Sequence, residues 1–166
     1  MPPSPDSKEI TVPIVRFLNE IGIATRAGEV PDDTFVPGIE VRGGTLIFNE
    51  AKMKYPGDLL HEAGHLAVMT PAERARANAT VDTGPGEEMA VIAWSYAAAL
   101  HLGIDPAIVF HPEGYKGGSL SILENFTQGR YFGVPLLQWW GMTAEKKNAA
   151  ESGLAPYPQM TRWSRD

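Results

Sequence analysis

The sequence predicts a mostly helical α+β fold, because stretches with helical periodicity fill most of the chain and one short hairpin pattern interrupts them. Proline- and glycine-rich breaks separate these stretches. The chain has 166 residues, 43% of them hydrophobic and 20% charged, which is enough for one domain with its own core. We therefore expect residues 1–166 to form a single domain, with residues 1–8 as a disordered tail.

The first predicted helix follows the proline-rich N-terminus. Apolar residues from Ile14 to Ile21 recur with a helical period. Thr11 can cap this helix, Pro13 is tolerable only in its first turn, and Gly22 can end it. An irregular stretch is expected after it.

Residues 39–41 and 45–48 flank Arg42-Gly43-Gly44, which predicts a β-hairpin. Residues 45–49 are a candidate edge strand, on which an extended peptide could add a further strand by β-augmentation. The alternative is an ordinary hairpin that covers the core.

The most informative stretch is LLHEAGHLAV, residues 59–68. On a helix, His61 and His65 lie one turn apart on the same face, so both imidazoles can bind one tetrahedral Zn²⁺. Glu62 lies between them and can act as general base toward a water molecule on the open side of the metal. The alternative is a buried helix that has this spacing by chance, but its three polar groups would then need other partners.

This pattern is the H-E-x-x-H signature, and the chain therefore resembles the zincin metallopeptidases. The chain has no cysteine, so imidazole and carboxylate groups must hold any zinc. A catalytic zinc takes three protein ligands, so one more is needed. The metzincin pattern would place a histidine six residues after His65, where this chain has Pro71. The gluzincin pattern takes a glutamate from the next long helix.

That next helix is predicted from Glu87 to about Leu102, and it begins with two glutamates. We favour Glu88 as the third ligand, because Ile92 and Ser95 follow it on one small and apolar helical face. Glu87 stays the alternative ligand, although its distance from the preceding glycine suits a helix start.

From Ala51 to Leu102, about a third of the chain, the sequence resembles the small ImmA/IrrE-type metallopeptidases. This resemblance implies a minimal zincin-like fold with an active-site helix, a second glutamate-bearing helix and a small β-sheet. It also implies a cytoplasmic peptidase with narrow substrate choice, for which a repressor protein is a candidate. The competing interpretation is a non-catalytic zinc-binding or protein-interaction module with the same fold.

The segments around the motif are predicted from shorter signals. Thr70-Pro71-Ala72-Glu73 is a capping box, so a short helix should run to about Ala79, with Arg74 on a solvated face. Asp58 is expected as a helix cap or first-turn carboxylate, with a role behind His61 as the alternative.

The C-terminal third contains one unusual loop and two short predicted helices, residues 119–127 and 134–140. In the loop, His111 or Tyr115 could donate a hydrogen bond to the oxyanion that peptide hydrolysis creates. The alternative is a surface loop with glycine turns. Trp139 and Trp140 are expected in the core or a lid, with a substrate pocket or dimer contact as the alternative.

Charge and hydropathy exclude other classes of protein. The net charge is −6 and there is no basic run, so we expect no nucleic-acid partner. The longest apolar stretch, residues 89–102, is too short to span a membrane, and the N-terminus lacks the pattern of a secretory signal. We therefore expect a cytoplasmic protein that acts on a peptide or protein substrate. The sequence leaves its oligomeric state open.

Overall fold

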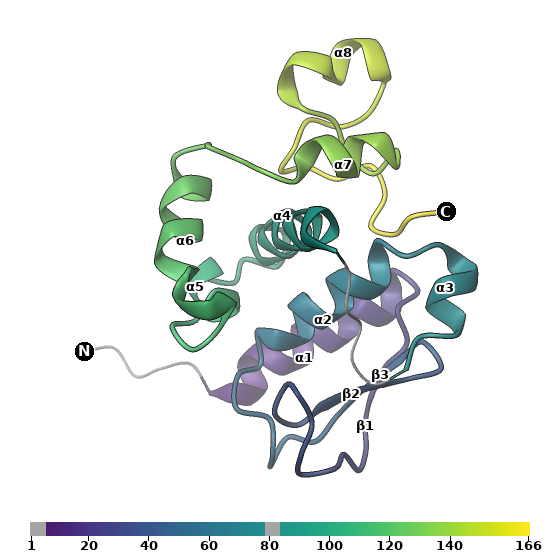
Figure 1. The fold of residues 1–166 in the computed structure, drawn as a ribbon, viewed down its shortest axis with the longest axis vertical. Coiled ribbons are helices and arrows are strands. Elements are labelled where there is room, and N and C mark those ends of the chain that lie inside the picture. The colour runs from purple at the N-terminus through teal and green to yellow at the C-terminus, as the bar shows by residue number, and fades with distance from the viewer. Residues whose placement is uncertain (1–5, 79–83) are drawn as a thin grey trace.

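The computed structural model describes residues 6–78 and 84–166, and it confirms a mostly helical α+β fold with one small sheet (Figure 1). In chain order the elements are α1 (Ser7–Glu20), β1 (Thr25–Ala27), β2 (Ile39–Arg42), β3 (Thr45–Phe48), α2 (Asp58–Ala67), α3 (Pro71–Ala75), α4 (Pro85–Leu102), α5 (Pro106–Val109), α6 (Ser119–Thr127), α7 (Val134–Trp139) and α8 (Ala149–Ser152). Two short 3-10 turns, Tyr115–Gly117 and Lys146–Asn148, complete the described part.

Helix α1 begins earlier than the apolar pattern predicts. Its N-cap is Asp6, whose carboxylate accepts a hydrogen bond from the backbone N–H of Lys8. Pro13 consequently lies inside the helix rather than in its first turn. Residues 1–5 of the predicted tail lie outside the described residues. Ser7 and Lys8, also assigned to that tail, are helical, because the N-cap side chain starts the helix before its first buried apolar residue.

The sheet corrects one prediction. Its strand order is β1-β3-β2, with β1 parallel and β2 antiparallel to β3. Residues 45–49 therefore supply the central strand, not an edge. The reason is β1, which lies in a stretch expected to be irregular: the N–H of Leu46 donates to Ala24 O and that of Gly28 to Phe48 O. The predicted hairpin itself is confirmed, and β2 is one of the two edges.

Helix α4 is the centre of the fold. Residues 90–99 of α4 are all buried and almost all apolar, as expected for the middle of a helix that other elements enclose. Helices α2, α5 and α7 pack against it, and α1 lies behind α2 in Figure 1. The sheet lies below α1 and α2 in that view, and α7 and α8 lie on the opposite side of α4.

The capping box before α3 is confirmed: Thr70 Oγ1 accepts from the Glu73 N–H, and the Glu73 carboxylate accepts from the Thr70 N–H. The helix ends at Ala75, earlier than predicted. Arg74 does not lie on a solvated face, because its guanidinium donates to carbonyl groups at the end of α2, including Leu66 O at 2.8 Å.

The two predicted C-terminal helices are confirmed as α6 and α7. Trp139, however, is 84% exposed and belongs to no core, because it projects from the outer face of the short helix α7. The last residues return to the end of α2, where the Arg165 N–H donates to Ala67 O. Along the described chain, no helix combines the length and the apolar character needed to cross a bilayer.

Candidate metal centre

The two motif histidines lie on α2, as the spacing predicts. Leu59, Leu60, Ala63 and Leu66 are fully buried, and they fix which faces of α2 meet the core. The imidazoles of His61 and His65 leave the helix together, with their rings nearly perpendicular at 87°. His65 is almost fully buried, and 17% of the His61 side chain is exposed, so the pair lies at the edge of the core.

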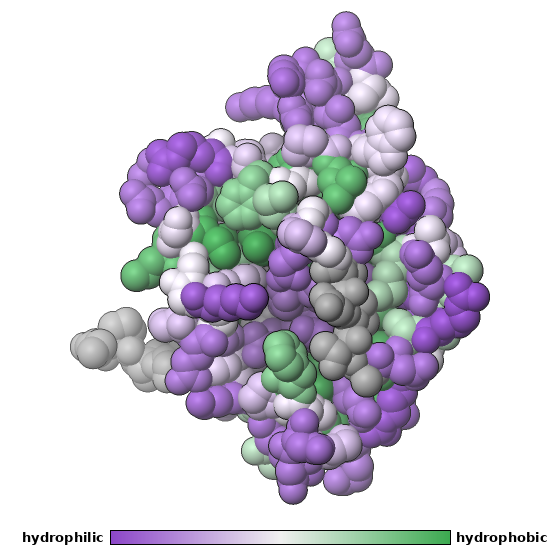
Figure 2. All heavy atoms as spheres, in the orientation of Figure 1, coloured by the Kyte–Doolittle hydropathy of each residue, from purple (hydrophilic) through white to green (hydrophobic). Residues whose placement is uncertain are grey.

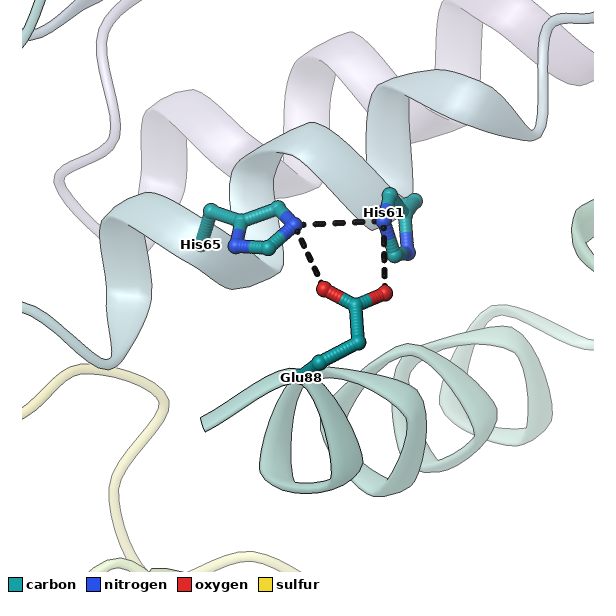
Figure 3. Close-up of side chains that lie close together, drawn as sticks. All are labelled: His61, His65 and Glu88. Atoms are coloured by element: carbon teal, nitrogen blue, oxygen red, sulfur yellow. Dashed lines mark hydrogen bonds and ion pairs between the residues drawn. The ribbon is translucent and has the colours of Figure 1, made fainter. Parts of the chain in front are cut away.

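Glu88 reaches this pair from the first turn of α4 (Figure 3). Its two carboxylate oxygens lie 3.3 Å from His61 Nε2 and 3.2 Å from His65 Nε2. The two Nε2 atoms are themselves 3.2 Å apart. A tetrahedral cation with bonds of about 2.0–2.1 Å keeps its ligand atoms about 3.3 Å apart. The three residues thus form a group that could hold a metal ion.

The electrostatics of the group suit a cation. Burial, with a smaller contribution from the neighbouring His65, lowers the pKa of His61 to about 4, and Glu88 opposes this shift. The ring is therefore neutral at neutral pH, which is the form that binds a metal. Burial alone would raise the pKa of Glu88, but its hydrogen bond to His65 and its electrostatic interaction with both histidines lower this pKa below its ordinary value. Glu88 is therefore ionised at neutral pH.

Glu62 lies one residue from His61 and faces a cavity. Burial raises its pKa to about 7, and the negative charges of Asp58 and Glu88 add to this effect while His65 opposes it. A carboxylate with a pKa near the working pH can both accept and release a proton. The cavity has a volume of about 200 Å³ and is lined by Pro31, Asp33, Thr34, Phe35, Val36, Ile39, Glu40, Val41 and Glu62.

This cavity is the part of the site that the sequence did not reveal. Its walls come from the loop before β2 and from the edge strand β2 itself, so it joins the edge of the sheet to the motif helix. The Pro31-Asp32-Asp33 turn marks this loop in the sequence, but nothing in it indicates a distant partner on α2. In the orientation of Figure 1, hydrophilic side chains gather in the hollowed middle of this face, with apolar side chains above and below (Figure 2).

The other candidate residues are distributed around the metal group. Glu87, beside Glu88 on α4, does not belong to the cluster of ligand atoms. Asp58 is the first residue of α2, after Gly57 at the N-cap, and its carboxylate lies 2.7 Å from Nε2 of His111. The hydrogen-bond partner of this first-turn carboxylate is therefore His111.

Tyr115 contacts the site directly, at a place the sequence did not suggest. Its hydroxyl lies 2.9 Å from Nδ1 of His61, whereas Glu88 lies near the other ring nitrogen, Nε2. Burial, together with the charges of Asp58, Glu88 and Glu62, raises the pKa of Tyr115 well above its ordinary value. The oxyanion role expected for Tyr115 or His111 stays a prediction.

Comparisons of the chain with protein-family models, with curated proteins and with solved structures found no match. The function must therefore be argued from the geometry of the site.

Proposed function

We propose that this protein is a zinc-dependent metallopeptidase. One observation carries the proposal: His61, His65 and Glu88 surround a space of the size of a tetrahedral zinc site, next to Glu62 with its raised pKa. The donor set of two imidazoles and one carboxylate is that of several catalytic zinc sites, in which a fourth position stays open. Zincin-like architecture, with α2 as active-site helix and α4 as glutamate-bearing helix, is part of the proposal.

Bound zinc would supply a Lewis acid that polarises the substrate carbonyl and lowers the pKa of a water molecule to about 7. Glu62 takes a proton from the attacking water as its oxygen bonds to the carbonyl carbon. Glu62 then gives this proton to the amide nitrogen as the C–N bond breaks, so that the products are a carboxylic acid and an amine.

The substrate is an extended peptide that pairs with the edge strand β2. Two facts support this choice: β2 lies at an edge of the sheet, and Ile39, Glu40 and Val41 of β2 line the same cavity as Glu62. Backbone pairing would align the peptide, and the cavity would receive one of its side chains. Phe35 and Val36 make part of that wall apolar, and Asp33 and Glu40 add carboxylates to it.

The first test is metal content, measured by plasma mass spectrometry on protein purified without a metal-affinity step. We expect about one zinc per chain. The second test is cleavage of a quenched fluorescent peptide library by the zinc-loaded protein, with Glu62→Gln as the matched control. The variant should bind zinc as tightly as the parent protein and should not cleave.

Each outcome is informative. Protein that binds no zinc, even after zinc is added, would overturn the whole proposal. Zinc binding with four protein ligands and no cleavage of any library member would favour a non-catalytic zinc-binding module. Cleavage that persists in Glu62→Gln would show that another residue moves the proton.

A further inference from the structure

We propose that Tyr115 is a positioning residue for His61: its hydroxyl holds the imidazole with Nε2 toward the metal and the ring proton on Nδ1. The inference rests on the proposed metal site. It assigns a task to the loop between α5 and α6, which contributes none of the three ligand atoms.

The two polar ends of the His61 ring have different partners. Nε2 lies 3.3 Å from the Glu88 carboxylate, and Nδ1 lies 2.9 Å from the Tyr115 hydroxyl. A metal bound at Nε2 leaves the single ring proton on Nδ1, and that N–H then donates to the tyrosine oxygen. The rings cross at 86° with centroids 5.1 Å apart, so the hydroxyl meets His61 along the ring edge.

A donor–acceptor contact of this kind matters because an imidazole can bind a metal through either nitrogen. A partner on the far nitrogen selects one tautomer, fixes the orientation of the ring and makes it a better ligand. Metal ligands usually obtain this support from a carboxylate or a backbone carbonyl. Here a neutral hydroxyl supplies it and adds no negative charge to a site that already contains Glu62 and Glu88.

The backbone at Tyr115 is strained, which indicates that its position is selected for something other than the stability of the loop. Tyr115 has φ 56° and Lys116 has φ 52°, and within residues 6–78 and 84–166 no other non-glycine residue has a positive φ. Such a conformation is unfavourable for a bulky residue and persists only where its surroundings enforce it. In this loop the conformation directs the tyrosine ring toward His61 and against Phe110.

Contacts within the loop enforce this conformation. Ser119 Oγ donates to His111 O at 2.6 Å, and it also lies 3.3 Å from Gly114 O, which ties both ends of the loop together. His111 is anchored in turn: its ring stacks on Tyr55 with centroids 3.7 Å apart.

His111 also contacts the motif helix α2. His111 Nε2 lies 2.7 Å from Asp58 Oδ1, and Asp58 precedes His61 by three residues, so both lie on one face of α2. The loop therefore contacts α2 at two points one turn apart: His111 contacts Asp58, and Tyr115 contacts His61. Two contacts of this kind set the register of the loop along the helix, which a single hydrogen bond would not do.

The test compares Tyr115→Phe with the parent protein. Phenylalanine keeps the ring contacts with Phe110 and His61 and removes only the hydroxyl. Zinc affinity, measured by competition with a chromogenic chelator, should fall about 10–100-fold, as for other residues that support a metal ligand. Tyr131→Phe is the matched control, because Tyr131 packs against Phe126 and Tyr157 and its variant should bind zinc with unchanged affinity.

A second readout is the protonation state of the His61 ring in the parent protein and in Tyr115→Phe. Long-range ¹H–¹⁵N spectra of the zinc-loaded parent protein should show His61 protonated at Nδ1, with Nε2 bound to the metal. In Tyr115→Phe the Nδ1–H signal should be lost to exchange with water. A residue that served only the stability of the loop would lower the melting temperature without changing this signal or the zinc affinity.

The outcomes separate this inference from the proposed function. If the parent protein binds no zinc, both are overturned. If the parent binds zinc and Tyr115→Phe binds it within about threefold, or if His61 of the parent binds through Nδ1, only the role of Tyr115 is overturned.

Discussion

Gly64 of α2 and Val91 of α4 approach so closely that a Cβ atom on Gly64 would lie 2.9 Å from Val91 Cγ1. The same atom would lie 3.2 Å from the ring of the fully buried Trp94. The glycine between the two motif histidines therefore allows the two helices to pack in contact. This contact brings Glu88, one turn before Val91 on α4, to the imidazoles of α2.

We predict that Gly64→Ala lowers both stability and zinc affinity. Alanine is the better helix former, but the added methyl group has no room, and overpacking of this kind costs about 1–3 kcal/mol. The helices must separate to accommodate it, which moves Glu88 away from His61 and His65. Urea unfolding and chelator competition measure the two effects.

The matched control for this prediction is Gly86→Ala, in the first turn of α4, where an added Cβ would meet no atom within 4 Å. It should leave stability unchanged or raise it by up to about 1 kcal/mol, as expected when alanine replaces glycine in a helix. Equal behaviour of the two variants would contradict the close approach of α2 and α4.

Glu88→Gln should weaken zinc binding by more than about 100-fold, the upper end of the range seen for residues that only support a ligand. The amide keeps the size of the side chain and removes the negative charge that balances the cation. Glu87→Gln is the natural comparison, because it changes the adjacent residue in the same way outside the cluster of ligand atoms. Isothermal titration with zinc should show unchanged affinity for that variant. The opposite ranking would assign the third ligand to Glu87.

The helical part of the site was predictable because its signals are local. The spacing of His61 and His65 fixes their relation to each other on any helix. The choice of Glu88 over Glu87 followed from the small and apolar residues Ile92 and Ser95, and these do lie buried in α4, on which Glu88 reaches the histidines.

The remaining features depend on contacts between distant segments. Strand β1 has three residues and one buried side chain, Thr25, so it carries no alternating pattern that could reveal a neighbour for β3. Its presence makes β3 central and leaves β2 as the edge beside the cavity. Tyr115 meets His61 across 54 positions of sequence, and only the folded loop brings them together.

Arg74→Ala should destabilise the end of α2. The Arg74 guanidinium donates to Leu66 O at 2.8 Å, Met69 O at 3.0 Å and Arg165 O at 3.0 Å, and so ties the end of α2 to the C-terminal segment. Its removal should cost about 1–3 kcal/mol in the free energy of unfolding. Arg76→Ala changes an exposed arginine on the same segment, and its free energy of unfolding should stay within about 0.5 kcal/mol of that of the parent protein. Equal values for both variants in urea unfolding would show that these hydrogen bonds do not stabilise the end of α2.

The metal-free protein should respond to pH through two groups that oppose each other. The pKa of His61 falls from 6.5 to about 4 on folding, so the unfolded chain binds the proton more tightly and stability is lost as pH falls through this window. The pKa of Glu62 rises from 4.5 to about 7, so the folded chain binds that proton more tightly and stability is lost as pH rises.

Between the ordinary pKa values of these two groups, 4.5 and 6.5, the opposing slopes cancel in large part. Glu62→Gln removes one of them. In this variant the free energy of unfolding, measured in urea with a chelator present, should rise with pH more steeply than in the parent protein, by up to about 1.4 kcal/mol per pH unit. The sign of the difference is decisive, since an exposed Glu62 with an ordinary pKa would leave the two pH profiles parallel.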